Sequence, residues 1–94
     1  MALTVRIVTP RKIAWEGTAN SVQAPGELGE FGVLPGHIAF LSTLRPGPLV
    51  IDTGSAKIKF NVGIGFADAG PGHVTVLTES CEDASVGQGQ QGPG

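Results

Sequence analysis

Cysteine, charged side chains and long apolar runs are all scarce in this 94-residue sequence. The one cysteine, Cys81, cannot form an internal disulfide, which is typical of a reducing compartment. No basic neighbour in the sequence lowers the pKa of Cys81, so we expect no reactive thiol. No apolar run approaches the roughly 20 residues of a membrane-spanning helix, and the first residues alternate like a strand rather than forming a signal peptide. We therefore expect a soluble, cytosolic chain.

Charge is low as well as scattered. Six Lys or Arg and eight Asp or Glu give a formal net charge of -2, whereas broad binding to nucleic acid or anionic lipid needs clustered basic residues. Trp15 and the four phenylalanines are too dispersed along the chain to form a platform on which bases stack. The composition therefore predicts no nucleic-acid partner and no electrostatic attachment to a membrane.

Glycine and proline, in contrast, are abundant, with 15 and seven residues. Because both residues favour turns over helices, the sequence predicts many short strands. Strict alternation marks Lys57–Val62 and Leu3–Ile7 most clearly. With weaker runs between them, eight or nine strands predict an all-β sandwich or barrel as one domain over residues 1–84. Residues 85–94 are rich in Gly, Gln and Pro, a composition typical of a flexible tail.

The sequence offers little that could carry out chemistry. His37 and His73 are the only histidines and both follow a Pro-Gly pair, so three or four metal ligands at suitable spacing are missing. Glu27 and Glu30 could act as an acid–base pair, but on a glycine-rich loop we expect them to be poorly held. Neither a Gly-x-Ser-x-Gly motif nor a phosphate-binding loop occurs. We therefore predict no catalytic, metal or cofactor site.

The most unusual segment runs from residue 24 to residue 48. Gly26, Gly29 and Gly32 recur at every third position, which favours successive tight turns or bulges with positive φ. Ile38–Leu44 is apolar at nearly every position, as expected for a strand enclosed between two layers. The segment is too rich in turn formers to be a plain strand and too apolar to be a disordered loop.

This segment also contains a candidate interaction surface. Phe31, Val33 and Leu34 lie among few charges on a loop that we expect to be anchored to the sheet. Apolar residues exposed in this way mark binding sites. Val33 and Leu34 could equally well fold inward as part of the core. The residues alone are compatible with both interpretations, an exposed binding surface and a part of the core.

Two motifs in the same segment resemble a known family. Glu-Phe-Gly-Val-Leu-Pro-Gly-His at 30–37, followed by Leu-Ser-Thr-Leu-Arg-Pro-Gly at 41–47, resembles the epsilon subunit of bacterial and chloroplast F-type ATP synthases, called delta in mitochondria. Trp-Glu-Gly at 15–17 and Pro-Gly-His-Val-Thr-Val-Leu at 71–77 also fit the family pattern. At 38–42 this chain has Ile-Ala-Phe-Leu-Ser where many relatives have Ala-Pro-Leu-Leu-Thr, a change that keeps the segment apolar.

The resemblance implies a two-layer antiparallel β-sandwich of about ten short strands. It also implies a non-catalytic subunit of the central stalk, coupling the gamma shaft to the membrane c-ring during proton-driven ATP synthesis. Its partners would be the gamma subunit, the c-ring and, indirectly, the alpha/beta hexamer. Its location would be peripheral, on the cytoplasmic face of the bacterial inner membrane. Glu30, Phe31, Gly32 and His37 correspond to a loop that faces the c-ring, whereas the gamma contacts would lie on exposed strand faces.

The chain departs from the family pattern after the sandwich. Relatives usually continue into a C-terminal hairpin of two helices, which inhibits ATP hydrolysis in bacteria and in some binds ATP. Here the residues from 87 to 94 are only Gly, Gln and Pro. We therefore expect no helical hairpin, no inhibition of that kind and no nucleotide bound through it.

Two other functions are compatible with the residues themselves. One is a free-standing β-sandwich module that binds an unrelated protein. The other is a small β-barrel that binds a carbohydrate or lipid in an interior cavity, although the mixture of small and bulky apolar residues gives no clear sign of such a cavity.

Overall fold

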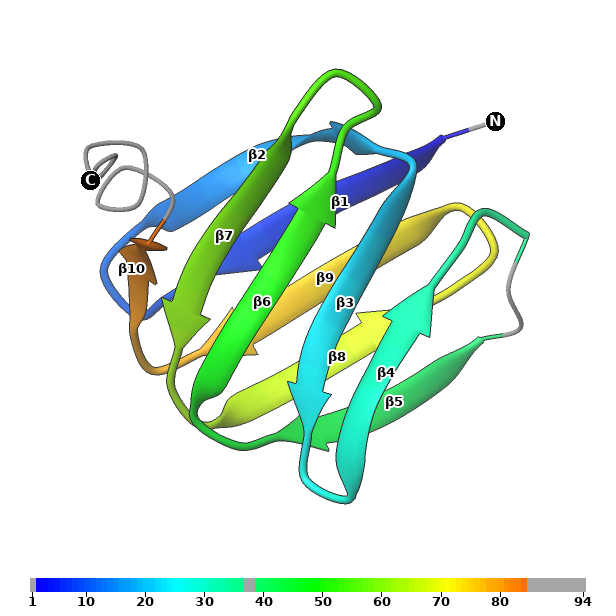
Figure 1. The fold of residues 1–94 in the computed structure, drawn as a ribbon. Helices are drawn as coiled ribbons and strands as arrows, with labels where there is room; N and C mark the ends of the chain where they lie inside the picture. The colour runs from blue at the N-terminus through cyan, green and yellow to red at the C-terminus, as the bar shows by residue number, and fades with distance from the viewer. Residues whose placement is uncertain (1, 37–38, 85–94) are drawn as a thin grey trace.

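The computed structural model describes residues 2–36 and 39–84. These residues form ten strands, which confirms the predicted all-β class (Figure 1). The strands are β1 (Leu3–Val8), β2 (Ile13–Ala19), β3 (Ser21–Gly26), β4 (Gly29–Val33), β5 (Phe40–Leu44), β6 (Gly47–Asp52), β7 (Lys57–Val62), β8 (Gly65–Ala69), β9 (His73–Thr78) and β10 (Cys81–Asp83). The expected tail at 85–94 and the expected absence of a hairpin concern residues outside this description and stay predictions.

The strands form two packed layers. One layer contains β4, β3, β6, β7 and β10 in that order, and the other contains β5, β8, β9, β1 and β2. Figure 1 shows the first layer lying in front of the second. The two are joined where Gly26 of β3 pairs with Leu44 of β5. The predicted sandwich is confirmed. Its described strand pairs are antiparallel except for β1 and β9, which run parallel.

The core fills the space between the layers. Along β1, alternate residues point inward and are fully buried, and the same period places Val74 and Val76 of β9 beside them. From the other layer, Leu49 and Ile51 of β6 are also fully buried. The largest fully buried side chains are Leu3, Val5, Ile7, Val22, Val33, Leu49, Ile51, Val74 and Val76. Tight packing of this kind is typical of a sandwich rather than of a barrel built around a ligand cavity.

The central segment differs from its prediction in two ways. Gly29–Val33 is not a loop but strand β4, which forms a hairpin with β3. Of the three regularly spaced glycines only Gly29, at the start of β4 directly after the turn, has a positive φ, of 140°. Strand β5 is not enclosed between layers either. It forms the edge of the second layer, and its Leu41 is 68% exposed.

Two turns at one end of the sandwich are locked together. Gly63 in the β7–β8 turn donates its N–H to the carbonyl of Ser80 at 3.0 Å, and Glu79 donates its N–H to the carbonyl of Ile64 at 3.0 Å. A Cβ on Gly65 would overlap the carbonyl oxygen of Leu77. Gly63 and Gly65 therefore let the backbones of the two turns approach closely.

This close approach makes Gly65 intolerant of a methyl group. We expect Gly65→Ala to lower the free energy of unfolding by about 1–3 kcal/mol or more, because the added Cβ has to displace the backbone of β9. Gly32→Ala is the matched control, since the nearest atom to its Cβ would be 3.9 Å away. Urea denaturation of both variants measures the difference. Equal stability of the two would contradict the close approach at Gly65.

Candidate functional site

The structure describes three of the four residues that the family resemblance assigned to one surface, and these three do not all lie on one side of β4. Glu30, Phe31 and Gly32 lie on β4, whose only described partner is β3, so β4 is an edge strand. Glu30 and Gly32 are exposed on the outer side of the first layer, whereas Phe31 points to the other side and is half-buried. His37 lies outside the described residues. The structure therefore brings Glu30 and Gly32 together and places Phe31 apart from them.

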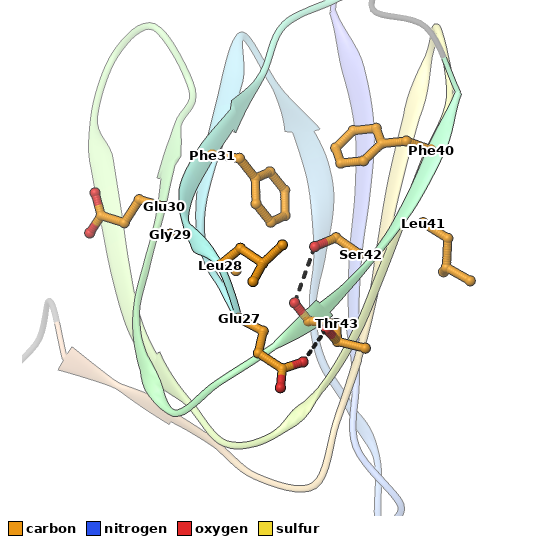
Figure 2. A pocket seen from close by; sticks show the side chains of 10 residues that line it. Glu27, Leu28, Gly29, Glu30, Phe31, Phe40, Leu41, Ser42 and Thr43 are labelled. Atoms are coloured by element: carbon orange, nitrogen blue, oxygen red, sulfur yellow. Dashed lines mark hydrogen bonds between the residues drawn. The ribbon is translucent and has the colours of Figure 1, made fainter.

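Phe31 closes the gap between the two layers. Its ring meets that of Phe40 on β5 edge to face, with centroids 5.3 Å apart and an interplanar angle of 80°. Figure 2 shows the two rings pointing toward each other between β4 and β5, while Glu30 and Leu41 point away. An open cleft of about 540 Å³ lies in front of the pair. Phe31 is therefore chiefly a packing residue, in contrast to the exposed role that the sequence suggested.

The turn between β3 and β4 is held by polar contacts. The hydroxyl of Thr43 donates a hydrogen bond to the Glu27 carboxylate at 2.6 Å (Figure 2), and the Glu27 N–H donates to the Thr43 carbonyl at 3.1 Å. The expectation that Glu27 is poorly held is therefore wrong, because β5 lies alongside the turn and supplies its partner. Leu28 at the apex of the turn is fully exposed.

A second group of exposed apolar residues lies on the outer side of the second layer. Register places Ile13, Val8, Leu77 and Phe66 in one row across β2, β1, β9 and β8. Ile64 lies in the turn just before Phe66 and is 54% exposed, while Phe66 and Leu77 are 49% and 47% exposed. We call these five residues the outer apolar patch.

Residues 64–66 form a ridge at the patch, and the surface has a depression on each side of this ridge. Ile64, Gly65 and Phe66 line two open depressions, one of about 500 Å³ toward β5 and one of about 430 Å³ toward β1. Arg45 and Glu79 line the first depression. Elsewhere on the second layer, Arg6 and Glu16 form an exposed salt bridge at 3.0 Å. An apolar ridge with depressions on either side suits the docking of another protein.

Sequence reasoning missed this patch. Its members come from three separate segments and meet only because β1 pairs with β9, a contact that local alternation does not reveal. The sequence did contain one signal for the patch. If Val74 and Val76 point inward, the period of two along a strand makes Leu77 point outward. The sequence instead drew attention to Val33 and Leu34, of which Val33 is fully buried and Leu34 is 61% exposed.

The described residues offer few groups for chemistry. No cluster of three or more His, Cys, Asp or Glu that could hold a metal ion occurs among residues 2–36 and 39–84. Partial burial raises the pKa of the Cys81 thiol, and the Asp83 carboxylate raises it further. Lys12 lowers that pKa, so a basic neighbour does act on it, but burial outweighs the effect. A helix long and apolar enough to cross a membrane is likewise absent from these two ranges.

Comparison with known families agrees with this fold. Residues 2–84 match the model of the ATP synthase delta/epsilon chain β-sandwich domain. The ATP synthase epsilon chain of Caulobacter vibrioides is 39% identical over 79 residues, which cover 84% of this chain and 92% of that protein. The chain therefore belongs to the ATP synthase delta/epsilon family, as the motifs at 30–37 and 41–47 predicted.

Other relatives are longer. The epsilon chain of Desulfatibacillum aliphaticivorans is 48% identical over 82 residues, which cover 85% of this chain but only 57% of that protein. Among solved structures, a chain of the Euglena gracilis mitochondrial ATP synthase has a TM-score of 0.82 and 22% identity over 87% of this chain and 53% of its own length. This similarity shows that the two chains share the fold of the sandwich.

We expect the Phe31–Phe40 contact to contribute measurably to stability. A double-mutant cycle with Phe31→Leu and Phe40→Leu should give a coupling energy of about 0.5–1.5 kcal/mol, the range found for edge-to-face aromatic pairs. Chemical denaturation of the two single variants and the double variant supplies the values. The control cycle combines Phe31→Leu with Phe66→Leu on the outer side of the other layer, where we expect no coupling. A coupling of zero in the first cycle would show that the rings do not interact.

Proposed function

We propose that this chain is a non-catalytic central-stalk subunit of a rotary F-type ATP synthase. It connects the gamma subunit to the c-ring during proton-driven ATP synthesis, and it contacts the alpha/beta hexamer only indirectly. Family membership over residues 2–84 supports the assignment, as do relatives named ATP synthase epsilon chain. A solved structure with the same fold, at TM-score 0.73, is titled as the central stalk and c-ring of the Tetrahymena thermophila enzyme.

The observation that carries this proposal is the outer apolar patch. Ile64, Phe66 and Leu77 expose about half of their side chains on a sheet whose other face is packed against the core. Burying these side chains against a partner would be worth about 25 cal/mol for each Å² removed from water. A rigid sheet also loses little conformational freedom on binding, which favours tight association. We assign this surface to the gamma subunit.

The opposite layer supplies the surface for the second partner. Glu30 and Gly32 face outward from β4, on the side of the sandwich away from the patch. We assign this edge to the c-ring. The half-buried Phe31 would contribute there chiefly by holding β4 in place, and His37, outside the described residues, is assigned to the same partner by the family resemblance alone. The end of β4 is tethered, because Gly36 donates its N–H to the Pro71 carbonyl at 2.7 Å. A stiff sandwich with partner surfaces on opposite layers is suited to transmit torque from ring to shaft.

The same assignment gives the location. The chain is a component of a membrane-associated complex. The relatives from Caulobacter and Desulfatibacillum are bacterial, so we place the subunit on the cytoplasmic face of the bacterial inner membrane, attached through its partners.

The patch assignment is tested by removing its aromatic side chain. We expect Phe66→Ser to raise the dissociation constant of the full chain for purified gamma subunit about tenfold or more, because central aromatic residues often dominate interface energy. Leu34→Ser is the matched control, since Leu34 is equally apolar and is 61% exposed outside the patch. Biolayer interferometry gives both constants. Unchanged binding by a folded Phe66→Ser variant would place the gamma contact elsewhere.

The edge assignment is tested in the assembled enzyme. Glu30→Lys should reduce ATP-driven proton pumping by inverted membrane vesicles more than it reduces ATP hydrolysis, because it reverses a charge on the surface assigned to the c-ring. Glu82→Lys is the control, since Glu82 is an exposed carboxylate on β10, at the far edge of the same layer. Circular dichroism of the isolated variants checks that both are folded. Equal pumping per ATP hydrolysed in the Glu30→Lys enzyme and the unmodified enzyme would argue against this edge.

A further inference from the structure

Thr78 is the one buried polar side chain in the core of the described residues. It occupies an inward position of β9, in line with Val74 and Val76, and is only 4% exposed. A threonine at an otherwise apolar position loses the hydration of its hydroxyl, which costs free energy unless the hydroxyl finds partners. The structure supplies those partners at the end of the sandwich, beneath the outer apolar patch.

The hydroxyl of Thr78 contacts backbone groups of both turns at this end. Its Oγ1 lies within donating distance of the carbonyl oxygens of Gly63 at 3.0 Å, Ile64 at 3.2 Å and Ser80 at 3.0 Å. Because a hydroxyl has one proton, these three acceptors share it. The N–H of Ser80 approaches the same oxygen at 3.5 Å. One side chain thus connects the β7–β8 turn with the β9–β10 turn.

The Ile64 peptide is fixed from two directions by this arrangement. Its carbonyl oxygen lies 3.2 Å from the Thr78 hydroxyl and also accepts the Glu79 N–H at 3.0 Å. Gly63 and Gly65 on either side have no Cβ, which lets the turn lie close to Glu79, Ser80 and Leu77. With its backbone held in this way, Ile64 points its side chain outward onto the ridge between the two depressions.

We infer that Thr78 is a positioning residue for the gamma-binding surface. Its hydroxyl sets the backbone of the Gly63–Gly65 turn and thereby fixes where Ile64 and Phe66 stand on the ridge. The inference rests on the proposed function, since it assigns the outer apolar patch to the gamma subunit. Thr78 itself does not contact the partner, because its side chain lies inside the sandwich. Its effect on binding is exerted through the shape of the turn.

The test compares three variants of the full chain. Thr78→Val keeps the shape of the side chain and removes the hydroxyl, whereas Thr78→Ser keeps the hydroxyl. Val22→Ala is the matched control, because Val22 is fully buried in the other layer and its truncation destabilises the fold away from the patch. Binding to purified gamma subunit is measured at a temperature at which circular dichroism shows all three variants to be folded.

We expect Thr78→Val to weaken binding about tenfold, which corresponds to about 1.4 kcal/mol. Thr78→Ser should restore binding to near the original affinity, and Val22→Ala should bind unchanged despite its lower stability. In Thr78→Val, the amide hydrogens of Gly63 and Glu79 should exchange faster with solvent, because both donate across the two turns.

Two results would overturn the inference while leaving the proposed function intact. One is unchanged affinity or unchanged amide exchange in Thr78→Val. The other is an equal loss of affinity in Val22→Ala, which would show that general stability governs binding. If the unmodified chain itself does not bind the gamma subunit, the proposed function fails and the inference falls with it.

Discussion

The packing of one face of each layer against the other is the constraint on which this structure depends. A domain of this size buries only a modest share of its surface, so its inward positions are almost all apolar and fully covered. Period-two alternation then commits every second residue to one side of the sheet. The outward positions of the second layer remain free to carry a different pattern, and there the chain places the apolar row of Val8, Leu77 and Phe66.

The ends of the sandwich are shaped by the same constraint. Where β3 crosses toward β5, the layers come together at Gly26 and Leu44, and backbone bonds from Glu27 and Arg45 close that corner. Where β4 and β5 diverge, the rings of Phe31 and Phe40 fill the space instead. Polar atoms enter the interior at Thr78, whose hydroxyl meets backbone carbonyls of the turns. Three different kinds of contact therefore hold the two layers together at their borders.

Much of the fold could be predicted from the sequence because the patterns that indicate strands and turns are local. Lys57–Val62 and Leu3–Ile7 alternate strictly, and both lie in strands with the expected faces buried. The glycines and prolines between such runs predicted the positions of most of the turns. The family motifs at 30–37 and 41–47 identified the family itself, since their order and spacing are specific.

The rest depended on contacts between distant segments. The segment around Phe31 has the composition of a loop, yet it is a strand because β3 offers it a ladder of hydrogen bonds. The outer apolar patch exists only once β1 has paired with β9, so no single window of sequence contains it. The polar partner of Glu27 likewise comes from Thr43, on a strand whose position the sequence did not fix.

The parallel pairing of β1 with β9 also has a consequence for how the chain acquires its structure. Thr4, near the start of the chain, pairs with His73, close to the end of the described residues, and β1 lies between β9 and β2 within its layer. During synthesis the ribosome has to release the chain through β9 before this layer can close. Pairing across such a sequence separation slows folding, since the intervening chain must be ordered first. The edge that β1 offers to β9 therefore stays open while the segments between them are synthesised, and chaperones can act on the hairpin of β1 and β2 until then.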